Sequence, residues 1–208
     1  KGPRMLSPKE FRHMLEISHP QYRAMLLLGL NCAFGNTDVA RIPRTAFDLE
    51  SGWVEFPRPK TGTYRKAWLW PETVEALRVS PKHTRQPADP GDKELMFVTP
   101  RKGLPWVHVE IRPDNTLRAV DNVCNTWKNM SHRGGVKRNG VGFYTLRRTF
   151  RTIADETLDQ PACDLVMGHV GGGMAAVYRQ QIGDDRIRRV CEHVRRWAFD
   201  LPAEDSEK

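Results

Sequence analysis

The sequence predicts a mainly α-helical domain with a small antiparallel β-sheet, an α+β class, and three observations support this prediction. Amphipathic segments with helix-capping residues recur along most of the chain. Two β-rich segments, 52–56 and 64–70, are separated by the turn-forming stretch PRPKTG, a pattern typical of a hairpin. Hydrophobic residues make up 39% of the chain and charged residues 28%, which is an ordinary globular composition.

The helices are indicated by caps and by apolar periodicity. SPKE at 7–10 has the pattern of a capping box with proline at the first helical position, and it predicts a helix to about residue 19. A helix at 160–168 is expected to end at Gly168, in the position that favours glycine. Residues 80–93 are expected to form a loop. The other expected helices cover 20–35, 36–42, 71–78, 116–132, 144–158, a segment after the glycines at 171–173, and 184–199.

Length and residue usage predict one domain over residues 1–200, followed by a flexible tail at 201–208. No apolar run approaches ~18 residues, so no membrane-spanning helix is expected. The four cysteines and seven histidines are dispersed, which argues against a disulfide framework or a metal site and fits a cytoplasmic protein. Because the chain starts at Lys1 without a signal pattern, we expect it to be a piece of a longer protein.

The net charge of +8 favours a polyanionic partner. Six basic residues and no acid lie between positions 131 and 151, and this cluster is either a phosphate-binding surface or a solvated face. Its members are Arg133, Lys137, Arg138, Arg147, Arg148 and Arg151.

Four features occur in a specific order along the chain. Lys60 lies at the tip of the expected hairpin, and Arg147 lies on a helix in YTLRRT. His169 follows in MGH at a helix end, and Tyr178 comes nine residues later. Together these features resemble the tyrosine recombinase (phage integrase) family, whose catalytic domain shares its fold with type IB topoisomerases. The resemblance covers nearly the whole chain.

The resemblance implies a site-specific DNA recombinase or integrase. Tyr178 would attack a DNA phosphodiester, forming a 3′-phosphotyrosine bond and releasing a 5′-hydroxyl, with neither a nucleotide cofactor nor a metal. Arg147 would hold the scissile phosphate and His169 would hydrogen-bond it. Lys60, with Lys66 as the alternative, would protonate the 5′-oxygen.

Two positions depart from the family pattern. The H-x-x-R box begins with Tyr144, and a phenol is a poor base at neutral pH. The family's first arginine falls on Gly35, although Asp38 matches the acid three residues later. Loss of one transition-state donor commonly costs ~10²–10³ in rate. Either the protein is impaired or another cation, such as Arg58 or Arg65, replaces the missing one.

The resemblance also implies double-stranded DNA as the partner and a homotetramer that forms only on DNA. It places a core-binding domain before this chain. Glycines 171–173 are either a hinge for Tyr178 or a plain loop, and the apolar stripe at 184–199 docks either on a neighbouring protomer or on its own core. Two other functions remain open, a non-catalytic DNA-binding relative and a topoisomerase-like relaxing enzyme. Candidate DNA contacts are Arg133, Lys137, Arg138, Arg148 and Arg151, the last two alternatively being held in salt bridges.

Overall fold

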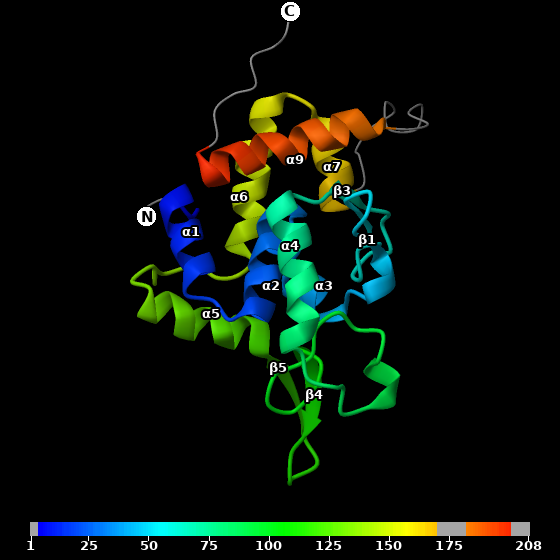
Figure 1. Cartoon of the computed structure of the whole chain (residues 1–208). Helices are drawn as coiled ribbons and strands as arrows, with labels where there is room; N and C mark the ends of the chain where they lie inside the picture. Colours follow the sequence, from blue (N-terminus) through cyan, green and yellow to red (C-terminus); the bar gives the residue numbers. More distant parts are fainter. Residues whose placement is uncertain (1–3, 170–181, 201–208) are drawn as a thin grey trace, which may run out of the picture.

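Helix α2 (Pro20–Asn31) is the centre of the core because its surface is apolar nearly all round. In the computed structural model its largest contacts with other α-helices are with α4 (Pro71–Val79) and α6 (Thr145–Ala154), and it also packs against α1 (Pro8–Glu16) and α9 (Asp184–Phe199) (Figure 1). A helix that is hydrophobic on every face must be covered on every face. Six of its apolar residues are at most 1% exposed, namely Ala24, Met25, Leu26, Leu27, Leu28 and Leu30.

The structure describes residues 4–169 and 182–200. The expected helices within these ranges are present, with shifted ends. The remaining helices are α3 (Asn36–Arg41), α5 (Asn122–Arg133) and α7 (Gln160–Met167), and short 3₁₀ turns follow α3, α4 and α6. No helix among these residues is both long enough and apolar enough to cross a bilayer.

The capping box at the start of α1 is confirmed. The Ser7 hydroxyl accepts from the Glu10 amide, and the Glu10 carboxylate accepts from the Ser7 amide at 2.8 Å. The helix ends at Glu16, earlier than expected, and His19 is extended (ψ 144°) immediately before Pro20. A residue that precedes proline is disfavoured in helical geometry, which separates α1 from α2.

The expected hairpin is confirmed as part of a three-stranded antiparallel sheet. The strands are β1 (Phe47–Asp48), β2 (Trp53–Glu55) and β3 (Lys66–Trp68), in the order β1-β2-β3. Val54 pairs with Ala67, and both side chains are 1% exposed on the core side. The sheet lies beside α7, which places the hairpin next to the end of that helix (Figure 1).

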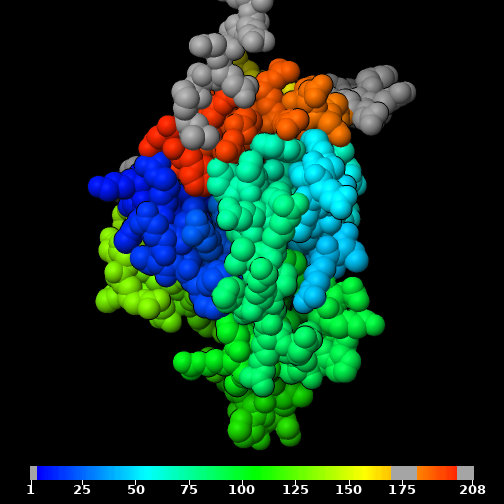
Figure 2. Space-filling model, viewed as in Figure 1, coloured from blue at the N-terminus to red at the C-terminus, as the bar shows by residue number. Residues whose placement is uncertain are grey.

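The sequence predicted one sheet, whereas the described residues form two. It also predicted a helix over 116–132, and this was wrong for the first residues of that range. Residues Val107–Ile111 (β4) and Leu117–Asp121 (β5) form a second antiparallel hairpin, which projects from the end of the molecule opposite α9 (Figure 2). Helix α5 begins only at Asn122, because Asp121 caps it by accepting from the Cys124 amide at 2.7 Å. Residues 117–121 are a strand because they pair with β4. The helical pattern of 116–132 gives no information about this pairing.

Helix α9 belongs to the chain's own core. It lies across the ends of α6 and α7 (Figure 1), and the Trp70 indole donates to the Cys191 carbonyl at 2.8 Å. Of the two alternatives left open for its apolar stripe, the structure shows packing against the chain's own core. Four residues of the stripe, Ile187, Val190, Cys191 and Val194, are 0% exposed, and the fifth, Trp197, is half-buried against the core.

Candidate active site

Arg147 is a buried arginine near the start of α6, with 2% of its surface exposed. Its Nη1 donates to the Ala33 carbonyl at 2.7 Å and its Nη2 to the Met167 carbonyl at 2.7 Å. These carbonyls lie just beyond α2 and at the end of α7, so the side chain connects three helices. No ion pair joins Arg147 to a carboxylate within the described part of the chain. Its positive charge is held by neutral dipoles, which leaves it available to an anion.

His169 lies directly against Arg147. The Nη2 of Arg147 donates to the Nε2 of His169 at 3.0 Å, which requires that Nε2 carry no proton. Burial, followed by the charge of Arg147, lowers the pKa of His169, while Asp164 opposes the shift from 3.6 Å away. At neutral pH the ring is therefore uncharged and carries its proton on Nδ1.

Gly168 ends α7 in the left-handed conformation, with φ 63° and ψ 45°, as the sequence predicts. A Cβ at this position would lie 2.5 Å from both Cγ and Cδ of Arg65. Glycine is thus required twice, by the backbone angle and by the arginine packed against it. This close approach brings the hairpin strand that carries Arg65 up to the Arg147–His169 pair.

Arg65 is connected through Asp38 to Gly35, the position at which the family pattern has an arginine. It is 1% exposed, and its guanidinium lies 4.4 Å from the centre of the Phe34 ring. Its Nη2 donates to Oδ1 of Asp38 at 3.1 Å, while Oδ2 of Asp38 accepts from the Gly35 amide at 2.6 Å. Asp38 therefore both starts α3 and neutralises a buried cation. Because Arg65 is enclosed, it supports the site from beneath and does not reach its surface.

Gly35 faces the ring of Tyr144. A Cβ at position 35 would meet two ring carbons of Tyr144 at 3.4 Å, an ordinary contact distance. Tyr144 is 46% exposed at the start of α6, and the Arg148 guanidinium lies 5.8 Å from its ring centre. The structure thus brings together the two positions at which the sequence departs from the recombinase pattern.

The two hairpin lysines differ in their contacts. Lys66 is bound to Asp184, with Nζ–O distances of 2.8 and 2.9 Å, and lies over the ring of Trp53 at 4.5 Å. Lys60 is exposed in the turn between β2 and β3, and it makes no side-chain hydrogen bond or ion pair with any described residue. Of the two, only Lys60 has an ammonium group free to meet a substrate.

The five candidate DNA contacts fall into two groups. Arg151 forms ion pairs with Asp155 at 2.9 Å and Asp164 at 2.8 Å, and Arg138 pairs with Glu10. Both are held in salt bridges, so they are weaker candidates for phosphate contacts than the sequence suggested. The exposed residues without a carboxylate partner among those described are Arg133, Lys137 and Arg148.

Tyr178 and the glycines at 171–173 lie outside the described residues, which run to His169 and resume at residue 182. The sequence identified Arg147, His169 and Asp38. The structure places His169 against Arg147 and binds Asp38 to Arg65, which packs on Gly168 beside them. It missed the two backbone carbonyls that hold Arg147. No local signal marks a carbonyl as an arginine acceptor, since the contact depends on how α2 and α7 pack against α6.

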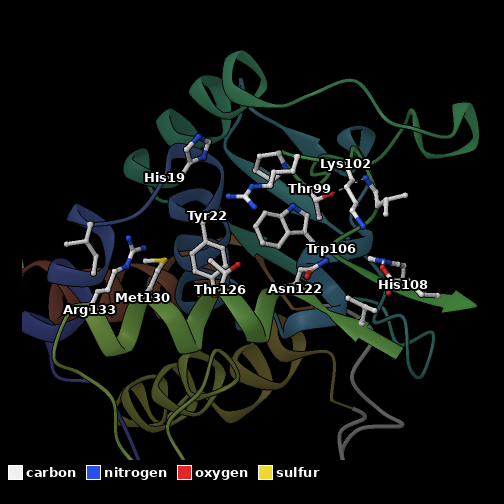
Figure 3. Close-up of a pocket in the computed structure, with 16 residues that line it drawn as sticks. His19, Tyr22, Thr99, Lys102, Trp106, His108, Asn122, Thr126, Met130 and Arg133 are labelled. Atoms are coloured by element: carbon white, nitrogen blue, oxygen red, sulfur yellow. Dashed lines mark hydrogen bonds and ion pairs between the residues drawn. The ribbon is translucent and has the colours of Figure 1, made fainter. Parts of the chain in front are cut away.

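A separate hollow of about 500 Å³ lies between α5, the start of α2 and the base of the β4–β5 hairpin (Figure 3). Tyr22 and Trp106 form its aromatic floor, with ring centres 5.7 Å apart. Lys102 and Arg133 lie at its margin. It shares no residue with the Arg147 cluster, so it is not part of the candidate active site.

The helices around α2 and the three-stranded sheet form a tyrosine recombinase catalytic-domain-like fold. Solved structures similar to this chain include those of integrases and site-specific recombinases. The integrase from mycobacterium phage Brujita is 20% identical, with a TM-score of 0.61. The aligned region covers 93% of this chain and 58% of the Brujita integrase. The Tn1549 transposon integrase, solved with a circular intermediate DNA, is 14% identical over 92% of this chain and 66% of its own, with a TM-score of 0.64.

The XerA recombinase has a TM-score of 0.60 at 14% identity, covering 94% of this chain and 66% of its own. The chain thus spans between 58% and 66% of the length of these three proteins. No protein-family model matches the sequence, and no curated protein matches it either. The likeness is one of fold, detected through structure.

Proposed function

We propose that this chain is the catalytic domain of a DNA strand transferase that cleaves and rejoins DNA through a 3′-phosphotyrosine intermediate. The observation that carries the proposal is the Arg147–His169 pair. A buried guanidinium with no carboxylate partner among the described residues is hydrogen-bonded to a neutral imidazole at 3.0 Å. An oxyanion would fit beside this pair, because its negative charge would balance the positive charge of Arg147.

In the proposed reaction, the Tyr178 hydroxyl gives its proton to solvent water, and its oxygen bonds to phosphorus while the bond to the 5′-oxygen breaks. Arg147 and His169 bind the non-bridging oxygens as charge develops on them. Lys60, whose ammonium is free at the hairpin tip, donates a proton to the leaving 5′-oxygen. The reverse attack by a DNA hydroxyl restores Tyr178. The cations come from side chains, so the mechanism needs neither a metal nor a cofactor.

The proposed partner is double-stranded DNA, and the net charge of +8 would assist its binding. Several proteins of this fold were solved on DNA, including the Tn1549 integrase and the XerH recombinase bound to difH. We further propose a homotetramer that assembles only on DNA, a cytoplasmic location, and a core-binding domain preceding residue 1. Arg133, Lys137 and Arg148 are the proposed backbone-phosphate contacts.

The test is a covalent-trapping assay on nicked duplexes tiled across the DNA that flanks the encoding gene. We expect a protein–DNA adduct that survives denaturing electrophoresis and forms equally well in EDTA. Tyr178→Phe should abolish the adduct while leaving DNA retention on native gels, whereas the control Tyr64→Phe, at a 49% exposed tyrosine, should leave adduct yield unchanged. Arg147→Ala should reduce cleavage by about 10²-fold or more.

Two results would count against the proposal. Adduct at wild-type yield in Tyr178→Phe would place the nucleophile elsewhere. Retention on native gels without any adduct would indicate the second candidate, a DNA-binding protein with impaired chemistry, which the glycine at position 35 favours.

A further inference from the structure

Arg58 is a half-buried arginine at the base of the hairpin turn that carries Lys60. Its amide donates to the Thr63 carbonyl at 2.8 Å, and its carbonyl accepts from the amides of Thr61 and Gly62 at 3.1 and 2.8 Å. The backbone of Arg58 is therefore held at three points, so its side chain leaves the hairpin from a fixed position.

The hairpin directs Arg58 toward the Arg147–His169 pair. A Cβ built at Gly168, the residue next to His169, would lie 3.3 Å from the Cβ of Arg58. The positive charge of Arg58 also contributes to lowering the pKa of Arg147 and of His169, which follows from this proximity. Arg58 thus approaches the candidate phosphate site from the hairpin side, whereas Gly35 lies on the α3 side beside Tyr144.

Arg58 makes no side-chain hydrogen bond or ion pair with any residue that the structure describes. The charge of Arg58 acts on both Arg65 and Arg147, and Asp38 is the carboxylate that opposes the positive charge at these two arginines. With Asp38 bound to Arg65 at 3.1 Å, the cluster keeps two uncompensated positive charges. Like charges in a partly enclosed site repel one another, and a bound anion relieves that repulsion.

The alternatives for replacing the missing arginine fit less well. Arg65 is 1% exposed; its Nη2 is bound to Asp38, and its Nη1, although without a partner among the described residues, is buried. Arg44 donates to the Leu95 carbonyl at 3.3 Å, on the far side of the turn after α3. Arg41 ends α3 and is exposed. Arg65 meets Gly168, the residue before His169, but it is enclosed and does not reach a phosphate at the surface of the site.

We propose that Arg58 is the second phosphate-binding guanidinium of this site, reaching from the hairpin the oxygen that an arginine at position 35 would otherwise bind. The inference rests on the proposed function for its biological meaning, but it makes a separate physical claim. Arg58, Arg147 and His169 form a binding site for a phosphate group, and this site does not depend on any covalent step.

The experiment is a titration of the full chain with inorganic phosphate at constant ionic strength, followed by the ring-proton NMR signals of His169. We expect saturable shifts in the wild type and about tenfold weaker binding in Arg58→Gln, as for the loss of one charge-assisted hydrogen bond. Arg58→Lys should bind with intermediate strength. The matched control is Arg23→Gln, which removes the same charge from an exposed arginine beside Glu72 and Glu75.

Equal phosphate affinity in Arg58→Gln and wild type, or no saturable shift in the wild type, would overturn the inference. Circular dichroism checks that the variant is folded, as expected for a side chain without hydrogen bonds to described residues. The two proposals fail separately. Phosphate binding that depends on Arg58 without any covalent DNA adduct refutes strand transfer alone, whereas an adduct formed at the wild-type rate by Arg58→Gln refutes the role of Arg58 alone.

Discussion

Gly168→Ala is expected to destabilise the domain strongly, because two independent constraints meet at this residue. Its φ is 63°, and an L side chain in the left-handed region costs about 1–2 kcal/mol. Its new Cβ would also lie 2.5 Å from Cγ and Cδ of Arg65, at least 1 Å inside an ordinary carbon–carbon contact of about 3.5–4.0 Å.

Arg65 cannot easily yield to this Cβ. Its Nε donates to the Phe56 carbonyl at 2.9 Å, and its Nη2 is bound to Asp38 at 3.1 Å. Overpacking of this kind costs about 1–3 kcal/mol, so the total loss in the free energy of unfolding should be roughly 2–5 kcal/mol. Urea denaturation at pH 7 measures it.

Two other glycines separate the two constraints. Gly135 has φ 67° with nothing within 4 Å of a built Cβ, so Gly135→Ala should show only the backbone cost of about 1–2 kcal/mol. Gly142 has neither constraint, and Gly142→Ala should be neutral or stabilising by up to about 1 kcal/mol. If Gly168→Ala loses no more stability than Gly135→Ala, the tight packing of Arg65 under the site is refuted.

Three further predictions concern the buried charges and the last helix. Asp38→Asn should cost about 3–5 kcal/mol in urea denaturation, because it leaves the Arg65 charge buried without a counterion, and a loss below about 1 kcal/mol would contradict this. His169 should titrate by NMR with a midpoint below its usual pKa of about 6.5. Since the native state then binds fewer protons than the unfolded state, the contribution of His169 to stability is present above about pH 6.5 and is lost as the pH falls through the native midpoint; a midpoint at or above 6.5 would refute it. Deletion of 184–208 should abolish cooperative unfolding, because it removes the core residues of α9, and an unchanged urea transition would show that the helix is dispensable.

Much of the fold could be predicted because its signals are local. The Ser7 capping box, the Gly168 helix end and the β2–β3 hairpin each depend on residues within about a dozen positions. The second hairpin was missed, although Asn115 takes a left-handed φ of 61° in its turn. Residues 117–121 carry both a helical and an extended pattern, and only their pairing with 107–111 decides between them.

The sequence by itself determined the helical class, the position of the hairpin, and the order of Lys60, Arg147 and His169 along the chain. Local propensity and residue chemistry are sufficient for these. Only the tertiary structure decided what surrounds Arg147, because its acceptor Ala33 is 114 residues away and Asp38 meets Arg65 across 27 residues. The tertiary structure also decided that α9 packs on the chain's own core and that Arg58 lies beside Gly168. Such contacts arise from the packing of whole helices and strands against one another, and a buried charge takes whichever partner that packing presents.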